Sequence, residues 1–153
     1  MTARQEASEA VRAFAQHEHL DLARGIDGIH EAACIVGSVP SSEVVRRVER
    51  VLSWFDRELQ PHLRWEEDWL YPQIEAATGT PWSTRAARFD HAEVRSAIER
   101  LRRDRVANAG HTDVDERSDL RCRLFSLEAL LRAHVDREEQ LLLPILLDAA
   151  VPA

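Results

Sequence analysis

Apolar residues recur three or four positions apart along most of this chain, which is the spacing of helices with one buried face. A first helix is expected over residues 10–36 and a second over residues 44–72, separated by a short stretch of glycine, serine and proline. Ser41 or Ser42 is positioned to cap the second helix, and Pro61 should kink it, because proline cannot donate a backbone hydrogen bond. The expected inward-facing residues of the first helix are Phe14, Leu22, Ile26, Ile29, Ala33 and Val36.

Two more helices follow from the same spacing. The third is expected over residues 83–106 and the fourth over residues 120–142, with a turn at residues 108–112 between them. Connections this short make successive helices antiparallel neighbours. We therefore expect one all-α domain of four helices over residues 1–153, with no strand. The inward-facing apolar residues expected in the second and fourth helices are Val44, Val48, Val51 or Leu52, Phe55, Leu59, Leu70, Leu120, Leu124, Leu127, Leu131, Leu141 and Leu142.

The charge and the apolar stretches exclude some partners. The net charge of −7 argues against nucleic acid as the main partner, because phosphate binding needs a basic surface. The first residues lack the apolar run of a signal peptide, and the longest apolar stretch, residues 141–147, is interrupted by Pro144. We therefore expect a cytoplasmic protein with no membrane span, in which Cys34 and Cys122 stay reduced.

Histidines and glutamates recur at one constant offset along the chain. A shift of 72 positions lays residues 13–77 over residues 85–149 and superposes polar residues that could bind a metal. The matched pairs are His19 with His91, His62 with His134, Glu66 with Glu138, Glu67 with Glu139, and Pro72 with Pro144. Most other residues differ between the halves, so we interpret the chain as an internal two-fold repeat, with halves over about residues 10–77 and 83–149.

Four of the histidines are expected at one level of the bundle. In antiparallel helices, two residues lie level when the turn falls midway between them. This holds for His19 with His62 and for His91 with His134. Glu66 and Glu138 follow their histidines by four residues and therefore share the same helix face. Buried polar groups without partners would each cost about 1–3 kcal/mol, whereas cations would satisfy all of them together. The predicted metal ligands are His19, His62, Glu66, His91, His134 and Glu138.

The remaining histidines and two further acids have different expected roles. His30 is expected to be a satisfied histidine at the edge of the core, and His17 and His111 are expected to be exposed. Glu67 and Glu139 point away from the face that carries the predicted ligands. Each of these two glutamates either supports a ligand histidine or is a solvated charge.

These residues resemble the signature of the hemerythrin-like, or HHE cation-binding, domain family. The repeated signature of that family is a histidine that opens an apolar helix, then His-x-x-x-Glu-Glu-x-x-Leu-aromatic-Pro. It stands here as EHLDLARGI with HLRWEEDWLYP, and as DHAEVRSAI with HVDREEQLLLP. Over about residues 10–149, the resemblance implies an up-down-up-down antiparallel four-helix bundle that holds two iron ions in a non-haem di-iron centre. It also implies that the four histidines are terminal ligands and that Glu66 and Glu138 bridge the irons, unlike the Glu-x-x-His arrangement of ferritin-type bundles.

Two departures from the oxygen carriers of that family bear on function. Those proteins use a His-x-x-x-His pair on the third helix and an aspartate on the fourth, where this chain has Arg95 and Glu138. Reversible oxygen binding is therefore the weaker expectation. The favoured one is a centre that reacts with or senses a small oxidant (oxygen, peroxide or nitric oxide), with peroxide decomposition or oxidant reduction as its activity.

Other functions stay open on the sequence alone. A non-enzymatic iron store or sensor would use the same ligands, and a sensor would act through another protein. Zinc or manganese could also occupy these positions, because imidazole and carboxylate donors do not select iron uniquely.

Overall fold

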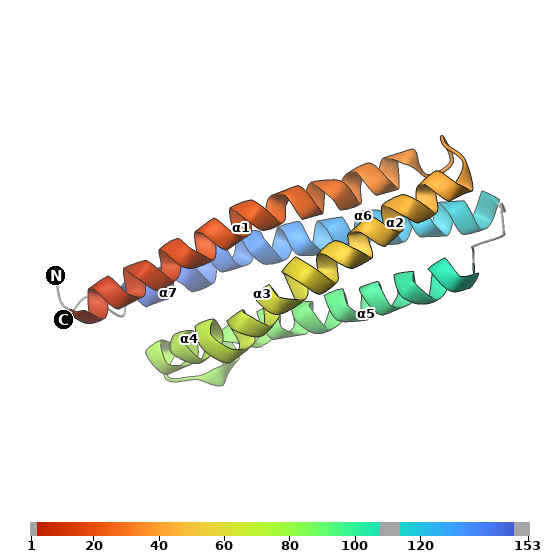
Figure 1. Ribbon diagram of the computed structural model, residues 1–153. Helices are drawn as coiled ribbons and strands as arrows, with labels where there is room; N and C mark the ends of the chain where they lie inside the picture. Colours follow the sequence, from red (N-terminus) through yellow and green to blue (C-terminus); the bar gives the residue numbers. More distant parts are fainter. Residues whose placement is uncertain (1–2, 108–113, 149–153) are drawn as a thin grey trace.

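The structure is a computed structural model that describes residues 3–107 and 114–148. These residues form four long helical rods and contain no strand (Figure 1). The first rod is α1 (Ala3–Ile35), and the third is a short 3₁₀ turn, η3 (Pro81–Thr84), followed by α5 (Arg85–Ala107). The second rod consists of α2 (Ser41–Trp54), η1 (Phe55–Leu59), α3 (Gln60–Trp65), η2 (Glu66–Leu70) and α4 (Tyr71–Thr78). The fourth rod consists of α6 (Val114–Arg137), η4 (Glu138–Leu142) and α7 (Leu143–Asp148).

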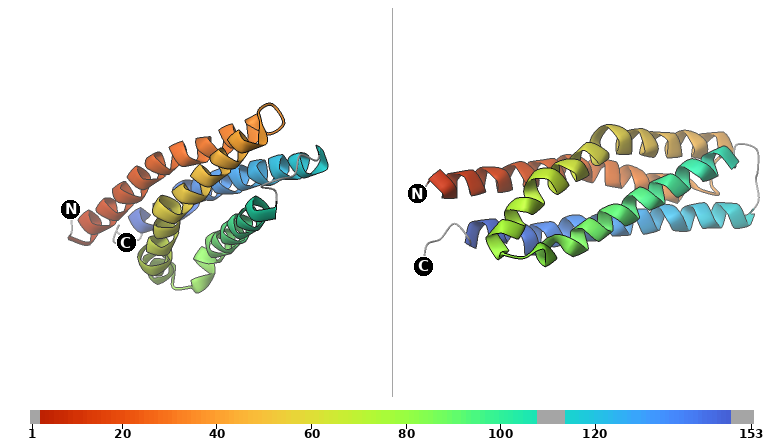
Figure 2. Two further views of the ribbon diagram at one scale, coloured as in Figure 1. Left: turned by 45° about the vertical axis from the view of Figure 1, so that its right-hand side comes forward. Right: turned by 90° about the horizontal axis from the view of Figure 1, so that it is seen from below.

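Successive rods run in opposite directions and close into a four-helix bundle. Helix α1 packs against α2 and α6, α5 packs against the same two helices, and α7 contacts both α1 and α4. Figures 1 and 2 show the chain running along the bundle and back again twice. The predicted all-α, up-down-up-down antiparallel bundle is confirmed.

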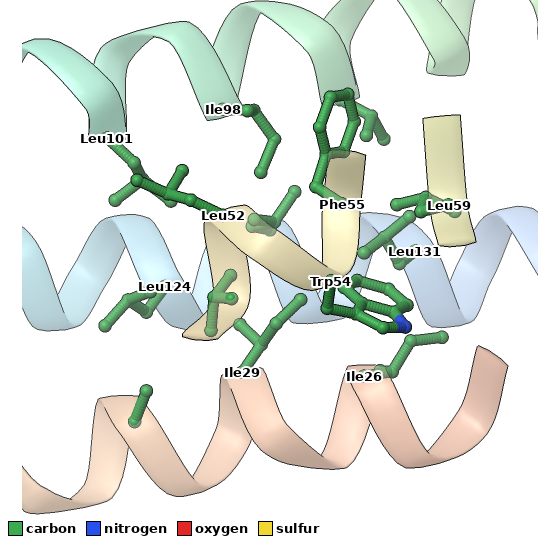
Figure 3. Close-up of a cluster of buried hydrophobic side chains, with 14 of the residues drawn as sticks. Ile26, Ile29, Leu52, Trp54, Phe55, Leu59, Ile98, Leu101, Leu124 and Leu131 are labelled. Carbon is green, nitrogen blue, oxygen red and sulfur yellow. The ribbon is translucent and has the colours of Figure 1, made fainter. Parts of the chain in front are cut away.

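A large apolar cluster fills one half of the bundle. All four rods contribute to it, because each turns about one residue in three or four toward the common axis. The predicted core positions from Leu22 to Val36 on the first rod are all buried in this cluster. The members labelled in Figure 3 are Ile26, Ile29, Leu52, Trp54, Phe55, Leu59, Ile98, Leu101, Leu124 and Leu131.

A smaller apolar cluster occupies the other half of the bundle. Its buried members are Ala15, Leu70, Tyr71, Ile74, Ala87, Leu142, Leu143 and Leu146. On every rod, at least one predicted metal ligand lies between the residues of the large cluster and those of the small one. The six predicted ligands therefore form a polar layer between two apolar regions, and we use the name polar layer for these six residues below.

Three turns of the rods are wider than an α-turn, and each precedes a proline. At the ends of η1, η2 and η4, the residue just before the proline donates its backbone N–H to a carbonyl five residues earlier. Pro61, Pro72 and Pro144 explain this, since proline lacks an N–H and its ring would collide with the carbonyl four residues before it. As expected for Pro61, the second rod changes direction between α2 and α3 (Figure 2). The other two wide turns begin at Glu66 and Glu138.

Two predicted core residues face outward instead. Phe14 is 47% exposed and lies edge-on against Trp65, with 4.8 Å between ring centroids, while Ala15 is buried in its place. Leu141 is 63% exposed, because it lies within the wide turn η4, which brings Leu142 inward.

Some predicted boundaries also differ from the structure. Helix α1 begins at Ala3, well before residue 10. Pro40 is the N-cap residue of α2 and no side-chain hydrogen bond caps this helix, so the prediction of a serine cap is wrong. The predicted turn at residues 108–112 lies outside the described residues.

Two further expectations concern membrane spans and disulfides. Among the described helices, none is both long enough and apolar enough to cross a membrane. Cys34 and Cys122 are free and exposed, so no disulfide joins them.

Gly25 lets α1 approach α2 closely. A Cβ atom at this position would lie 1.8 Å from Cε2 of Trp54, a buried member of the large cluster. We expect Gly25→Ala to displace the indole and to lower the free energy of unfolding by about 1–3 kcal/mol. At Gly28 on the same helix, a Cβ would meet nothing within 4 Å. Gly28→Ala is therefore the matched control and should raise stability by about 0.5–1 kcal/mol through helix propensity.

Urea denaturation of both variants and the parent protein measures these effects. A Gly25→Ala protein as stable as the parent would contradict the close approach of α1 to Trp54.

Candidate metal centre

The six residues of the polar layer lie close together, although they come from four different rods. Each is almost completely buried, with exposed fractions between 0% and 5%. The antiparallel rods bring them to one level, as the positions of the turns lead one to expect. The six residues and their elements are His19 (α1), His62 (α3), Glu66 (η2), His91 (α5), His134 (α6) and Glu138 (η4).

Glu66 lies between two pairs of histidines. Its Oε1 is 2.7 Å from Nε2 of His62 and 3.5 Å from Nε2 of His19, and we call these two histidines the α1–α3 pair. Its Oε2 is 3.2 Å from Nε2 of His91 and 3.9 Å from Nε2 of His134, which we call the α5–α6 pair. One carboxylate oxygen thus faces each pair.

Glu138 spans the same two pairs from the opposite rod. Its Oε2 lies 3.3 Å from Nε2 of His19, and its Oε1 lies 3.8 Å from Nε2 of His134. The hydroxyl of Tyr71 donates a hydrogen bond to Oε1 of this carboxylate. The centre therefore consists of two histidine pairs with two carboxylates across them.

Two acids form hydrogen bonds to the outer nitrogen of a histidine in the polar layer. Oε1 of Glu67 is 2.8 Å from Nδ1 of His91, and Oε1 of Glu139 is 3.2 Å from Nδ1 of His19. Arg95 in turn donates to both oxygens of Glu67, at 2.7 and 3.0 Å. Glu67 and Glu139 are therefore not merely solvated charges, because each is hydrogen-bonded to a histidine of the polar layer and orients its ring.

Two further acids face the other histidines at longer distance. Asp90 lies 3.6 Å from Nδ1 of His134, and Glu18 lies 3.9 Å from Nδ1 of His62. Arg137 donates a hydrogen bond to Asp90. The sequence interpretation missed both acids, although each directly precedes a predicted ligand and the two are 72 positions apart like the ligands themselves.

The pKa shifts reflect two carboxylates buried close to four imidazoles. Burial by itself lowers the pKa of His19, but the nearby carboxylates of Glu138 and Glu66 outweigh burial and raise this pKa to about 10. Burial would raise the pKa of Glu66, yet the four neighbouring imidazoles stabilise its charged form and hold this pKa well below its usual range. Burial and the negative charge of Glu66 raise the pKa of Glu138. Cations between the two carboxylates would remove this repulsion.

The unsatisfied atoms of the polar layer test whether a cation fits there. Oε2 of Glu66 and Oε2 of Glu138 are buried, and neither has a hydrogen-bond partner. Two groups of donors have ligand atoms within 4.8 Å of one another: Glu66 with the α5–α6 pair and Glu138, and Glu66 with the α1–α3 pair. Orphaned carboxylate oxygens between groups of imidazole nitrogens fit metal binding.

A surface cavity of about 420 Å³ opens beside the α1–α3 pair. Its lining combines His62 with apolar side chains and with four charged ones: Phe14, Leu22, Pro61, Trp65, Glu18, Asp21, Arg57 and Glu58. Of the six residues of the polar layer, the cavity thus reaches His62.

The other described histidines lie outside the centre. The side chain of His17 is 73% exposed and pairs with Asp21, as expected for a solvated histidine. His30 is exposed and lies 2.9 Å from Glu128, so it is satisfied, although it lies farther out than the core edge. His111 falls outside the described residues.

The sequence was compared with protein families, curated proteins and solved structures. The model of the hemerythrin HHE cation-binding domain matches residues 10–146, which include all six residues of the polar layer. No curated protein and no solved structure gives a match. The family model covers most of the chain, and the buried cluster of histidines and glutamates fits a metal. The chain therefore belongs to the hemerythrin HHE cation-binding domain family.

Proposed function

We propose that this protein binds two iron ions and reacts with a small oxidant such as peroxide, oxygen or nitric oxide. The observation that carries the proposal is the orientation of Glu66 and Glu138, because each has one oxygen toward each histidine pair. A carboxylate in that orientation suits a bridge between two cations. The α1–α3 pair would hold one ion and the α5–α6 pair the other, with Glu66 and Glu138 available to both.

Iron in these positions would supply Lewis acidity and electrons, and its coordination would leave room for a small ligand. The protein's own groups prepare the centre for it. Glu139 and Glu67 hydrogen-bond the outer nitrogens of His19 and His91 and orient these rings so that Nε2 points inward. The apolar clusters on both sides exclude bulk water. The cavity beside His62 offers a route from the surface for molecules of a few atoms.

Removing one imidazole should remove iron. In protein loaded anaerobically with ferrous iron, we expect two ions per chain in the parent and one or fewer in His62→Ala and His134→Ala, measured by metal analysis. His17→Ala is the matched control, because His17 lies on α1 near His19 but is exposed, and it should keep two ions.

A parent protein that carries one ion or none after this loading would contradict the two-ion centre. Parallel loading with zinc and manganese tests metal identity, and retention of either ion in preference to iron would contradict the assignment to iron.

Metal removal should destabilise the fold, because the carboxylates and imidazoles of the polar layer then lose their shared partner. An ion present at a thousand times its dissociation constant stabilises a protein by about 4 kcal/mol. For a chain of this size, that corresponds to a melting temperature about 10 °C lower in the metal-free protein. Calorimetry of metal-free and iron-loaded protein measures the difference, and identical melting curves would refute the coupling of metal to fold.

The oxidant reaction can be tested separately. Arg95 stands where oxygen carriers have a fifth histidine, and its guanidinium is bound to Glu67, so it cannot serve as a further ligand. We therefore expect the ferrous protein to be oxidised in air and the ferric protein to convert hydrogen peroxide to water and oxygen. Absorption spectra through cycles of oxygenation and degassing, with an oxygen electrode for peroxide, measure both reactions.

The outcomes separate the alternatives. A fully reversible oxygen complex would identify a carrier and overturn the proposed reaction. Iron binding with a conformational change but no turnover of oxidant would favour a store or sensor. The iron-depleted His62→Ala variant is the control for peroxide consumed by free iron.

A further inference from the structure

Tyr71 is the only tyrosine of the chain, and its side chain is completely buried beside the polar layer. Its hydroxyl donates a hydrogen bond to Oε1 of Glu138 and lies 2.9 Å from Nε2 of His91. That nitrogen of His91 faces Glu66, whereas Nδ1 of the same ring faces Glu67. The tyrosine oxygen therefore lies on the side of the imidazole where a bound ion would lie.

The spacing around Nε2 of His91 is that of neighbouring ligands of one ion. Nε2 of His134 and Oε2 of Glu66 each lie 3.2 Å from it, and the oxygen of Tyr71 lies 2.9 Å from it. First-row ions such as zinc hold nitrogen and oxygen at about 2.1 Å, so two ligands at a right angle are about 3 Å apart. The tyrosine oxygen thus has the separation expected of another ligand in the same set.

Only one half of the centre has such a tyrosine oxygen. The offset of 72 positions pairs Tyr71 with Leu143, which is also completely buried but has no donor atom in its side chain. Arginines bind both outer acids of the α5–α6 pair. Among the described side chains, no arginine pairs with Glu18 or Glu139, the outer acids of the α1–α3 pair.

The surface cavity also lies on only one of these sides. Its lining includes His62 and Glu18 from the α1–α3 side, and it includes neither histidine of the α5–α6 pair. The α5–α6 side thus has an extra buried oxygen and tethered acids, and the α1–α3 side has the opening.

We propose that the oxygen of Tyr71 is a further ligand of the ion held by His91 and His134. The two ions are then inequivalent, and an incoming small ligand binds at the ion held by the α1–α3 pair. This inference rests on the proposed di-iron centre. When the oxygen bonds to the ion, the phenol O–H bond breaks and the proton is released to solvent, as with other groups that lose a proton on binding a metal.

The single tyrosine makes the test unambiguous. A phenolate bound to ferric iron gives a charge-transfer band in visible light, and resonance Raman excitation in that band enhances the ring vibrations of the phenolate. We expect both signals in the iron-loaded, air-oxidised parent protein and their complete loss in Tyr71→Phe. Thr84→Val is the matched control, because it removes a different buried hydroxyl that donates to a glutamate, Glu75, and it should keep both signals.

Iron content and azide binding complete the experiment. A parent protein with two ferric ions but no phenolate signals would overturn the role of Tyr71 and leave the di-iron proposal intact, whereas a protein that binds no iron would overturn both. Azide added to the parent should change the spectrum without removing the phenolate band, because it binds the other ion. Loss of the band on azide binding would overturn the assignment of the open position.

Discussion

Two carboxylates buried in the middle of a helical bundle constrain the rest of this structure. Removing an isolated carboxylate from water costs several kcal/mol, so Glu66 and Glu138 require hydrogen-bond donors or positive charge on every side. Each of the four rods supplies one imidazole for this purpose, and an acid on a neighbouring rod faces the outer nitrogen of every ring. The polar layer can cross an apolar core only because all four rods are in register at this level.

The six residues of the polar layer could be predicted because two regularities of the sequence converge on them. Helical spacing assigns them to inner faces, and the positions of the turns bring them to one level. Glu18, Asp90 and Tyr71 could not be found in this way. These three residues reach a neighbouring rod only at a particular separation and rotation of the rods. The spacing of residues along the chain does not specify either quantity.

The errors in the predicted core have local causes. Phe14 and Leu141 both have helical spacing from buried neighbours, and both face outward. Phe14 covers the edge of Trp65 at the rim of the cavity, where a large ring fits against one neighbour but is not enclosed. Leu141 lies in a turn that is wider than an α-turn, so counting in steps of three and four residues fails there.

The wide turn η2 also sets an angle within the second rod. In an unbroken α-helix, residues five positions apart differ by about 140° around the axis, and Glu66 and Tyr71 would then point to different sides. The π-turn between them reduces the rotation per residue, and both side chains reach the polar layer. Pro72, which is itself exposed, causes that turn. A proline on the surface of the bundle thus sets the helical phase beyond Glu66. It thereby decides which side chain is the next to meet the centre.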